Sequence, residues 1–260
     1  MNNKALKNVM IIAGGSGIGK VIALEFLQQG YHVSVADVED SFLDQIKSDF
    51  PQIDTYCLDV SKPDDVHNVK EAVEQKNEKL DVLIQCTGVA GPTAEFGDIS
   101  ISDWDRTIQI NVNGLFYSTQ AFLPLVRKSE EGSIVFLSSN AAFSGFPYRS
   151  PYTFSKWGLI GLTKTLAMEL GKYGIRVNAI CPGSVEGDRI DRVIAADAKN
   201  QNKSVNEIKE LYTRQVSLKK FVTAQEIADM CIFLAGRSGR SISGQAIGID
   251  GHTEGLSTLT

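Results

Sequence analysis

The sequence lacks paired cysteines, long apolar runs and a basic stripe. Its four cysteines are far apart and show no Cys-x-x-Cys spacing: Cys57, Cys86, Cys181 and Cys231. This pattern favours free thiols in a reducing compartment. No apolar run is long enough to cross a membrane, and the opening Met-Asn-Asn-Lys-Ala-Leu-Lys has no signal-peptide core. We therefore expect a cytoplasmic protein with no membrane partner.

Charge and composition exclude further classes. The chain has 26 basic and 31 acidic residues, a net charge of −5, so we expect no nucleic-acid partner. Hydrophobic residues make up 43% and charged residues 22% of the 260 positions, which is typical of a globular protein with a sizeable core. No repeat, low-complexity tract or long linker divides the chain. Residues 1–260 are therefore expected to form a single domain.

Short apolar runs alternate with longer helical patterns along the chain. Strands are predicted at 9–13, 31–37, 55–58, 80–86, 133–138, 176–180 and 245–249. Helices are predicted at 17–29, 42–50, 63–77, 103–127, 151–172 and 223–235, with Gly174 as a stop after the fifth. This order predicts an α/β, Rossmann-type, doubly wound parallel sheet of about seven strands with helices on both faces. The polar stretch 188–216 interrupts the rhythm and is expected to form two charged helices over the ligand crevice.

A glycine-rich turn follows the first predicted strand and opens a helix. It reads Ala13-Gly14-Gly15-Ser16-Gly17-Ile18-Gly19. Glycines there let the backbone turn tightly and approach a pyrophosphate, which rests on the helix N-terminus. The pattern predicts dinucleotide contacts at Gly14, Ser16, Gly17, Ile18 and Gly19. The alternative is a plain turn between a strand and a helix.

Acidic residues end the second and third predicted strands. Asp37 lies where a carboxylate binds the adenosine ribose hydroxyls, and it would repel a 2′-phosphate. Because the glycine turn holds no Arg or Lys, NAD(H) is the preferred cofactor and NADP(H) the less favoured one. Asp59 and Val60 follow the third strand and are expected to bracket the adenine. The alternatives are a solvated Asp37 and a turn-forming Asp59.

Tyr152 and Lys156 are four residues apart, in a segment where Ser150 is expected to cap a helix and Pro151 to occupy its first turn. Residues at i and i+4 share one face of a helix. The ammonium would favour the phenolate and lower the tyrosine pKa, so that Tyr152 can exchange a proton with an alcohol or carbonyl near neutral pH. An exposed surface pair is the alternative for the spacing taken alone.

Taken together, these motifs resemble the short-chain dehydrogenase/reductase family over nearly the whole chain. The resemblance implies hydride transfer between NAD(P) and an alcohol–carbonyl pair, with a Rossmann-type core. It makes Tyr152 the acid/base, Lys156 the ligand of the nicotinamide ribose and Ser139 the group that holds the substrate oxygen, whereas Ser138 is only its neighbour. Asn111 matches the family Asn that holds a proton-relay water. The remaining matches are cofactor contacts at Gly88, Pro182, Gly183 and Val185.

Three positions depart from the family pattern. Ile12-Ala13 replaces the usual Thr-Gly before the loop, Gln85-Cys86-Thr87 replaces Asn-Asn-Ala before Gly88, and Gly187 stands where a Thr often follows the Pro-Gly turn. These changes lie around the cofactor and leave the catalytic set intact. We expect cofactor binding to be retained with altered affinity, and Cys86 to be a buried structural thiol and not a redox site.

The predicted reaction is the interconversion of a secondary alcohol and a carbonyl with NAD(H), in which no metal is required. Two alternatives remain open: an NADPH-dependent reductase of 3-oxoacyl-type carbonyls, and a dinucleotide-binding sensor without turnover. The substrate is a small molecule held by Ser139, Arg149 and Tyr152. Its charge is left open, because the arginines near the expected pocket also suit solvated helix faces: Arg149, Arg189, Arg192 and Arg214.

Aromatic residues and two helix glycines suggest further packing surfaces. A pocket wall or core packing would explain Phe143, Phe146, Tyr148 and Trp157. Gly158 and Gly161 lie inside the Tyr152 helix, where each costs about 1 kcal/mol relative to Ala. Close approach of a second helix would explain them, and the resemblance implies that this helix pairs with its own copy. We expect a homotetramer or homodimer.

Overall fold

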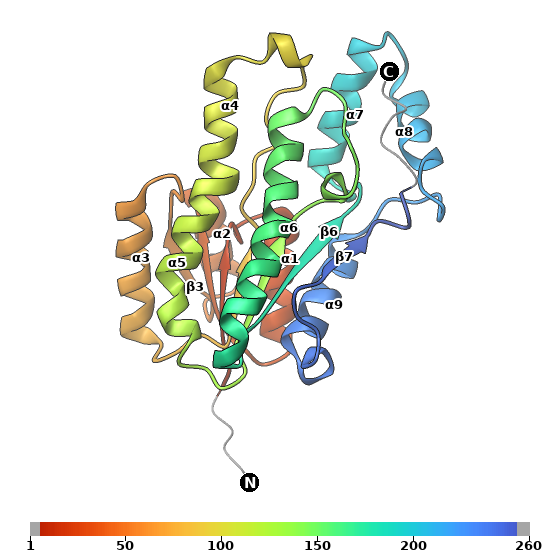
Figure 1. The fold of residues 1–260 in the computed structure, drawn as a ribbon. Helices are drawn as coiled ribbons and strands as arrows, with labels where there is room; N and C mark the ends of the chain where they lie inside the picture. The colour runs from red at the N-terminus through yellow and green to blue at the C-terminus, as the bar shows by residue number, and fades with distance from the viewer. Residues whose placement is uncertain (1–5, 254–260) are drawn as a thin grey trace.

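Seven parallel strands form one sheet in the computed structural model, which describes residues 6–253 (Figure 1). The strands lie in the order β3-β2-β1-β4-β5-β6-β7. Their bounds are β1 Asn8–Ile12, β2 His32–Asp37, β3 Asp54–Cys57, β4 Val82–Gln85, β5 Ser133–Leu137, β6 Arg176–Pro182 and β7 Ala246–Ile249. The chain builds outward from β1 to β3 and then returns to the other side of β1 with β4. This reversal of strand order is where doubly wound sheets bind ligands, and the predicted fold class is confirmed.

Helices cover both faces of the sheet. One face carries α1 (Gly17–Gln28), α2 (Asp40–Asp49) and α9 (Ala224–Ala235), and the other carries α3 (Pro63–Lys76), α5 (Leu115–Val126) and α6 (Ser150–Leu170). Figure 1 shows α4 (Ile101–Ile108) rising above α5, and α7 (Asp188–Asn200) with α8 (Val205–Arg214) standing beside the upper part of α6. The sheet is therefore buried on both sides, and ligands reach it at its edge.

Alternation along β1 explains the two cores. Val9 and Ile11 point to the layer of α1 and α9, whereas Met10 and Ile12 point to the layer of α3 and α5. All four side chains are at most 1% exposed. Each buried side chain of this size contributes about 1.5–3 kcal/mol by leaving water. A strand buried on both faces needs a continuous apolar run, which is why the sequence signal for β1 is so clear.

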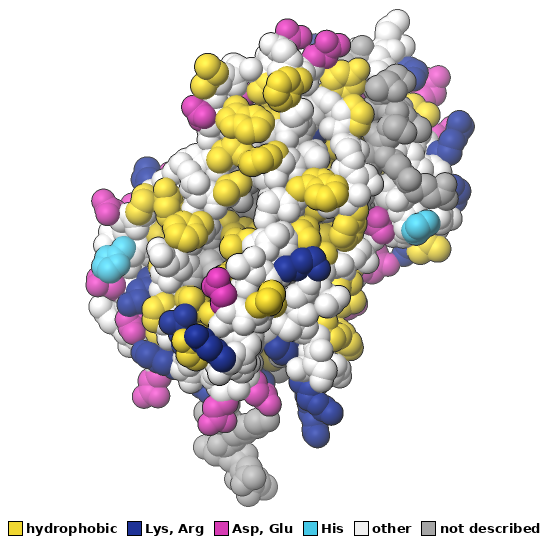
Figure 2. All heavy atoms as spheres, viewed as in Figure 1, with side chains coloured by type: hydrophobic (Ala, Val, Ile, Leu, Met, Phe, Trp, Pro, Cys, Tyr) yellow, Lys and Arg dark blue, Asp and Glu magenta, His cyan; other side chains and the backbone are white. Residues whose placement is uncertain are grey.

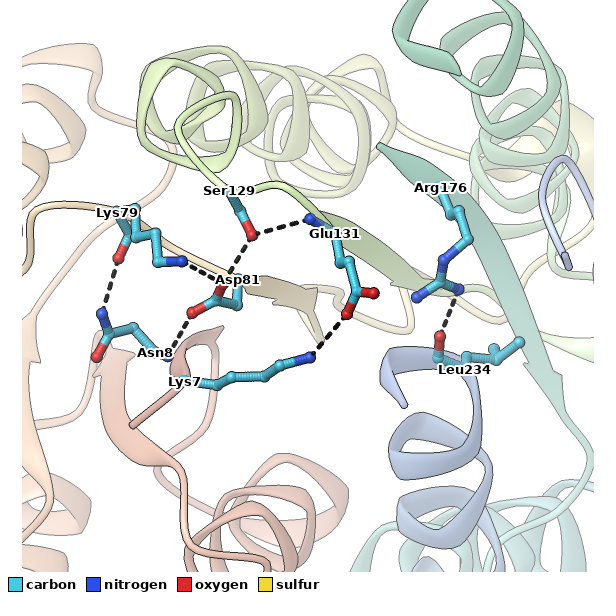
Figure 3. A network of polar contacts seen from close by, with 8 residues as sticks. All are labelled: Lys7, Asn8, Lys79, Asp81, Ser129, Glu131, Arg176 and Leu234. Atoms are coloured by element: carbon cyan, nitrogen blue, oxygen red, sulfur yellow. Dashed lines mark hydrogen bonds and ion pairs between the residues drawn. The ribbon is translucent and has the colours of Figure 1, made fainter. Parts of the chain in front are cut away.

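A polar network closes the amino end of the sheet (Figure 3). The Asp81 carboxylate accepts hydrogen bonds from the Asn8 backbone N–H at 2.9 Å and from the Ser129 hydroxyl at 2.7 Å, and it pairs with Lys79 at 3.3 Å. The Arg176 guanidinium donates to carbonyls around the end of α9. The Asp81 bonds tie the start of β1 and the start of β4 to the loop before β5, whereas the Arg176 bonds tie β6 to the end of α9. The carboxyl ends of the strands are left free for a site.

Two helix predictions need correction. Ser150 does not cap α6: it is the first residue of the helix, and the N-cap is Arg149, which makes no side-chain capping bond. The predicted helix over 103–127 begins at Ile101 and is interrupted by a π-helical turn, Gln109–Gly114, between α4 and α5. A π turn adds one residue to a helical turn, so apolar periodicity alone does not reveal it.

The two helices predicted within 188–216 are present as α7 and α8. They share a small apolar cluster of Ile194, Ala198, Ile208, Tyr212 and Phe221, separate from the two main cores. Ser204 caps α8 through a reciprocal pair of bonds with Glu207. This segment therefore has packing of its own and lies beside the sheet edge instead of within the sheet layers.

Within residues 6–253, no helix combines the length and apolar character needed to span a bilayer.

Candidate active site

The glycine turn between β1 and α1 forms a cradle that side chains would fill. A Cβ added to Gly19 would lie 2.2 Å from the Ala13 carbonyl oxygen, and Gly17 has φ +51°. Ser16 is the N-cap of α1, and its side chain makes no capping bond. The first-turn N–H groups of α1 are therefore available to an anion. This geometry fits the pyrophosphate of a dinucleotide.

Ala13 occupies the position where the family pattern has glycine, and its backbone is left-handed. Its φ is +58°, a conformation that costs an L-residue about 1–2 kcal/mol. The neighbouring Gly14 N–H donates to the Ala36 carbonyl at 3.1 Å, so the turn is tied to β2. The fold keeps the tight turn despite the Cβ on Ala13. The backbone at Ala13 is therefore strained, because alanine stands where the family pattern has glycine.

Asp37 lies directly against the glycine turn. One carboxylate oxygen accepts the Gly15 N–H at 2.9 Å, and the other accepts the Glu39 N–H at 3.2 Å. Further acidic groups surround this strand end: hydrogen bonding to Asp40, together with the charges of Asp40, Asp65 and Asp37, raises the pKa of the Cys57 thiol. The strand end is therefore an electronegative corner.

Asp59 is engaged in a turn. Its carboxylate accepts bonds from the Ser61 N–H at 3.0 Å and the Ser61 hydroxyl at 2.6 Å, and these bonds lower the pKa of Asp59. The turn leads into α3. Val60 packs so closely on Gly114 that a Cβ there would lie 2.7 Å from Val60 Cγ2. The structure thus brings Asp59 and Val60 to the sheet edge through local turn chemistry.

Tyr152 and Lys156 lie on the first turns of α6, at the carboxyl edge of β5. The Lys156 ammonium is 5.6 Å from the Tyr152 ring centroid and donates to the Leu137 carbonyl at 3.0 Å. Burial opposes ionisation of Tyr152, but the Lys156 and Arg189 charges, a hydrogen bond with Ser139 and the Arg149 charge together lower its pKa. Lys156 is only 5% exposed, and burial lowers its own pKa. The pair is therefore not an exposed surface pair.

Ser139 and Ser138 have different surroundings. Ser139 accepts the Ala141 N–H at 3.2 Å at the start of a short 3₁₀ turn and hydrogen-bonds Tyr152. Ser138 donates to the Lys156 carbonyl at 3.2 Å and so ties β5 to α6. Of the two hydroxyls, Ser139 is the one that reaches the tyrosine.

Asn111 lies in the π turn and is 3% exposed. Its side-chain oxygen accepts the Val89 N–H at 2.8 Å, and its amide donates to the Val89 carbonyl at 3.0 Å and to the Ser155 hydroxyl at 3.1 Å. Ser155 in turn donates to the Tyr152 carbonyl at 2.7 Å. The Asn111 side chain makes no bond to the backbone of its own helix. It joins the segment after β4 to α6, the helix that carries Tyr152.

The segment after β4 uses different ties from the family pattern. Gln85 is fully buried and donates to Ser118 at 3.0 Å and Thr119 at 3.1 Å on α5. Burial raises the pKa of the Cys86 thiol to about 12, as expected for a structural cysteine. Among the described side chains, the Thr87 hydroxyl is one of the few buried polar groups without a hydrogen-bond partner. A bound ligand at this strand end would supply one.

Gly88 and the turn after β6 border the same edge. A Cβ on Gly88 would lie 3.3 Å from Lys156 Nζ. Pro182 ends β6, and the Gly183 N–H donates to the Ile249 carbonyl at 2.9 Å. Val185 forms a bridge to Val222. At Gly187 φ is +127°, a region open to glycine and unfavourable for Thr, which gives this departure a backbone reason.

A pocket of about 310 Å³ lies beside the start of α6, and its wall includes Arg149, whose charge acts on Tyr152, but not Tyr152 itself. It is lined by Thr93, Glu95, Phe146, Pro147, Tyr148, Arg149, Val193, Asp197, Gln201 and Tyr212. Three of the predicted residues, Phe146, Tyr148 and Arg149, are therefore in its wall. The α7–α8 residues Asp197 and Tyr212 were missed, because amphipathic periodicity does not tell which polar residue of a helix faces a pocket. They form a 2.6 Å hydrogen bond from the Tyr212 hydroxyl to the Asp197 carboxylate.

Other candidates lie away from the pocket wall. Arg192 and Arg214 are exposed helix residues, and Phe143 is 45% exposed. Trp157 is 52% exposed on α6. Arg189 is exposed, but its charge acts on Tyr152.

Comparison with known proteins matches nearly the whole chain. A family model described as "Enoyl-(Acyl carrier protein) reductase" matches residues 12–253. The chain is 34% identical over 249 residues to the 3-oxoacyl-[acyl-carrier-protein] reductase FabG of Thermotoga maritima, covering 94% of this chain and 96% of that protein.

Solved structures of similar proteins differ in their cofactor. An actinorhodin polyketide ketoreductase variant with NADPH superposes with a TM-score of 0.91 at 26% identity, covering 96% of this chain and 97% of the other. An NAD⁺-bound xylitol dehydrogenase has a TM-score of 0.90, also at 26% identity, with coverages of 95% and 98%.

Proposed function

Because the chain belongs to the short-chain dehydrogenase/reductase family, we propose that it interconverts a secondary alcohol and a carbonyl compound with NAD(H), with Tyr152 as the acid/base. The observation that carries this proposal is the buried Lys156 beside a tyrosine of lowered pKa, with Ser139 hydrogen-bonded to that tyrosine. A phenol with a lowered pKa is suited to proton exchange with an alcohol near neutral pH.

In the direction of alcohol oxidation, Ser139 holds the substrate oxygen and Tyr152, as phenolate, removes the hydroxyl proton. Lys156 stabilises the phenolate before the transfer. The nicotinamide ring, when bound, supplies the acceptor for the hydride that leaves the carbinol carbon. In the reverse direction Tyr152 donates the proton to the carbonyl oxygen. The Lys156 charge and the Ser139 hydroxyl lower the barrier in this proposal because both already favour negative charge on the Tyr152 oxygen before the substrate reacts.

Asn111 belongs to the same proton path in this proposal. The side-chain amide of Asn111 already donates to the Val89 carbonyl and the Ser155 hydroxyl. A water would therefore have to donate a hydrogen bond to an oxygen of Asn111. The π turn also changes the usual i→i+4 pairing of backbone carbonyls at this point. Asn111 therefore positions the Tyr152 helix and is the residue that would hold a relay water behind Lys156.

The cofactor would extend along the carboxyl edge of the sheet. Gly14, Ser16, Gly17, Ile18 and Gly19 would hold the pyrophosphate. Asp37 would bind the adenosine ribose and Asp59 with Val60 would flank the adenine. The nicotinamide half would meet Gly88, Tyr152, Lys156, Pro182, Gly183 and Val185.

The acidic corner supports NAD(H) over NADP(H). A 2′-phosphate would meet Asp37 in a corner that also holds Asp40 and Asp65. Replacing Asp37 with Ala should shift the ratio of kcat/KM for NAD(H) to that for NADP(H) towards NADP(H) by about tenfold or more, as expected for loss of hydrogen bonds to a charged group. An unchanged ratio would remove Asp37 from this role.

The decisive test of the reaction is Tyr152→Phe. This variant should lose turnover of secondary alcohols by about 10²-fold or more, as expected for loss of a general acid/base, yet retain NADH binding measured by fluorescence. Tyr173→Phe is the matched control, because Tyr173 is 42% exposed at the far end of α6. If Tyr152→Phe turned over as fast as the parent protein, Tyr152 would not be the acid/base.

Similarity to the Thermotoga maritima reductase favours one second candidate, reduction of 3-oxoacyl-type carbonyls with NADPH. Steady-state rates on a 3-oxoacyl thioester with NADPH, compared with rates on small ketones with NADH, separate the two. The acidic corner predicts that NADH is the better donor on either substrate.

We further propose that residues 1–260 form one domain in a homodimer or homotetramer, in a reducing cytoplasmic compartment that suits four free cysteines. Figure 2 shows hydrophobic side chains gathered over the α4–α6 face, where Phe116, Phe154 and Trp157 are about half exposed. A Cβ on Gly161 would have no neighbour within 4 Å in its own chain, so Gly161→Ala should stabilise an isolated chain by about 1 kcal/mol. Sedimentation that shows a monomer at micromolar concentration would refute the assembly.

A further inference from the structure

We propose that the substrate is a small monocarboxylic oxo or hydroxy acid whose carboxylate binds Arg149 while its reacting oxygen lies at Tyr152. This inference rests on the proposed function and adds the substrate class to it. Arg149 is the N-cap of α6, and Tyr152 follows three residues later. Arg149 lines the pocket, and its charge acts on Tyr152.

The Arg149 guanidinium is short of partners. It is half-buried and donates to the Thr93 hydroxyl at 2.7 Å, and the ion pairs between described residues do not include it. A guanidinium has five N–H donors in a fork that matches a carboxylate. No nitrogen of Arg149 is both buried and without a partner, so its remaining donors are open to solvent. A ligand carboxylate in the pocket would replace water at these donors.

Two unfavourable features at adjacent residues mark the same place. A positive charge at a helix N-terminus opposes the helix dipole, so Arg149 destabilises the start of α6. Tyr148 has φ +64°, a left-handed conformation that is rare for a bulky residue. Such strain persists where the surrounding structure enforces it, and it clusters at ligand sites. Here the strained residue and the unpaired cation both line the pocket.

The spacing sets the size of the acid. Arg149, the N-cap, and Tyr152, in the first turn of α6, are three residues apart, and each group acts electrostatically on the other. An acid that reaches both groups therefore needs only a short carbon chain between its carboxylate and its reacting oxygen. The pocket volume of about 310 Å³ is at the lower end for ligand sites, which also favours a small molecule.

Two carboxylates in the pocket wall limit the substrate to one negative charge. Asp197 is 9% exposed, lies beyond ion-pair distance of Arg149 and accepts the Tyr212 hydroxyl. Glu95 also lines the pocket. These carboxylates repel a second anionic group, whereas Arg149 in the same wall attracts the first. A dicarboxylate should therefore be a poor substrate.

In the reductive direction the carbonyl carbon gains the hydride of NADH and the oxygen gains the Tyr152 proton. The balance is oxo acid + NADH + H⁺ → hydroxy acid + NAD⁺. The test uses 2-oxobutanoate, 3-oxobutanoate and 4-oxopentanoate, each beside its methyl ester, with 2-oxoglutarate as the dicarboxylate and 2-butanone as a neutral ketone. NADH consumption is followed by absorbance.

At least one monocarboxylate should exceed its ester in kcat/KM by tenfold or more. In Arg149→Gln that kcat/KM should fall about 10- to 100-fold, mainly through KM, as expected for a charge-assisted pair. The ester should change by less than threefold. Arg192→Gln is the control on exposed α7, and it should leave both unchanged. NADH binding and thermal melting of each variant establish that it is folded.

Esters used as well as acids by the parent protein, or equal losses on acid and ester in Arg149→Gln, would overturn the inference. Reduction of 2-butanone without reduction of any oxo acid would also overturn it and would leave the proposed function standing. Absence of NADH and NADPH consumption with every compound would overturn the proposed function itself.

Discussion

Replacing Ala13 with Gly should stabilise the protein. Ala13 has φ +58° in the turn that follows β1. A left-handed backbone costs an L-residue with a Cβ about 1–2 kcal/mol, a cost that glycine does not have. Glycine also makes the unfolded chain more flexible, which offsets about 0.4–1 kcal/mol. The expected net gain is about 0.5–1 kcal/mol, or a rise in Tm of about 2 °C for a chain of this size.

The assay is thermal or urea unfolding of protein free of dinucleotide, since bound ligand would itself raise the apparent stability. Asn202→Gly is the matched control. Asn202 is exposed and also left-handed, with φ +51°, but asparagine tolerates this region. The control should gain clearly less than Ala13→Gly. If Ala13→Gly lowered the unfolding midpoint or gained no more than Asn202→Gly, the strain assigned to Ala13 would be wrong.

Three further changes test the site and its supports. In Lys156→Met, loss of the ammonium should raise the pKa of Tyr152, so the rise of alcohol oxidation with pH should move to higher pH at saturating cofactor; an unmoved profile would separate the two residues. Gly19→Ala places a Cβ 2.2 Å from a backbone oxygen, so the loop must open and the Kd for NADH, measured by fluorescence, should rise at least tenfold. Trp157→Glu puts a charge on the apolar α6 surface and should lower the sedimentation mass if that surface pairs with a second copy.

Sequence patterns predicted the sheet well because its central strands, such as β1, β4 and β5, are buried on both faces. Every residue from Val9 to Ile12 is apolar and buried, so this strand appears in the sequence as an unbroken apolar run. Helix ends were harder, because caps are decided by side-chain geometry. Thr223 begins the predicted α9 with a reciprocal bond pair to Glu226, whereas Ser150 falls inside α6 and leaves Arg149 as the N-cap. Thr223 and Ser150 both carry a hydroxyl that can cap a helix. Only Thr223 lies just before the first residue of its helix, and the sequence alone does not show this difference.

The site residues that the motifs specify are brought together, and the pocket wall is not predictable in the same way. Ser139 follows β5, and Tyr152 and Lys156 lie on α6, the next long helix. Their short separation along the chain therefore brings the three side chains close together. Asp197 and Tyr212 come from two helices outside the sheet, and their 2.6 Å bond depends on how α7 and α8 pack on each other. The π turn at Asn111 is also a tertiary feature, since its bonds to Val89 and Ser155 cross between elements.

The departures from the family pattern argue against a sensor without turnover. Two of the three departures are accommodated by the surrounding structure: Gln85 bonds α5 through Ser118, and Gly187 adopts a backbone that Thr would resist. Lys156 meanwhile remains buried, with its ammonium bonded to the Leu137 carbonyl. A dinucleotide-binding protein without turnover would use Lys156 for the nicotinamide ribose, but it would have no need for the lowered pKa of Tyr152. Tyr152 is placed with Lys156 and Ser139 so that its phenolate is favoured, and this arrangement favours an active enzyme.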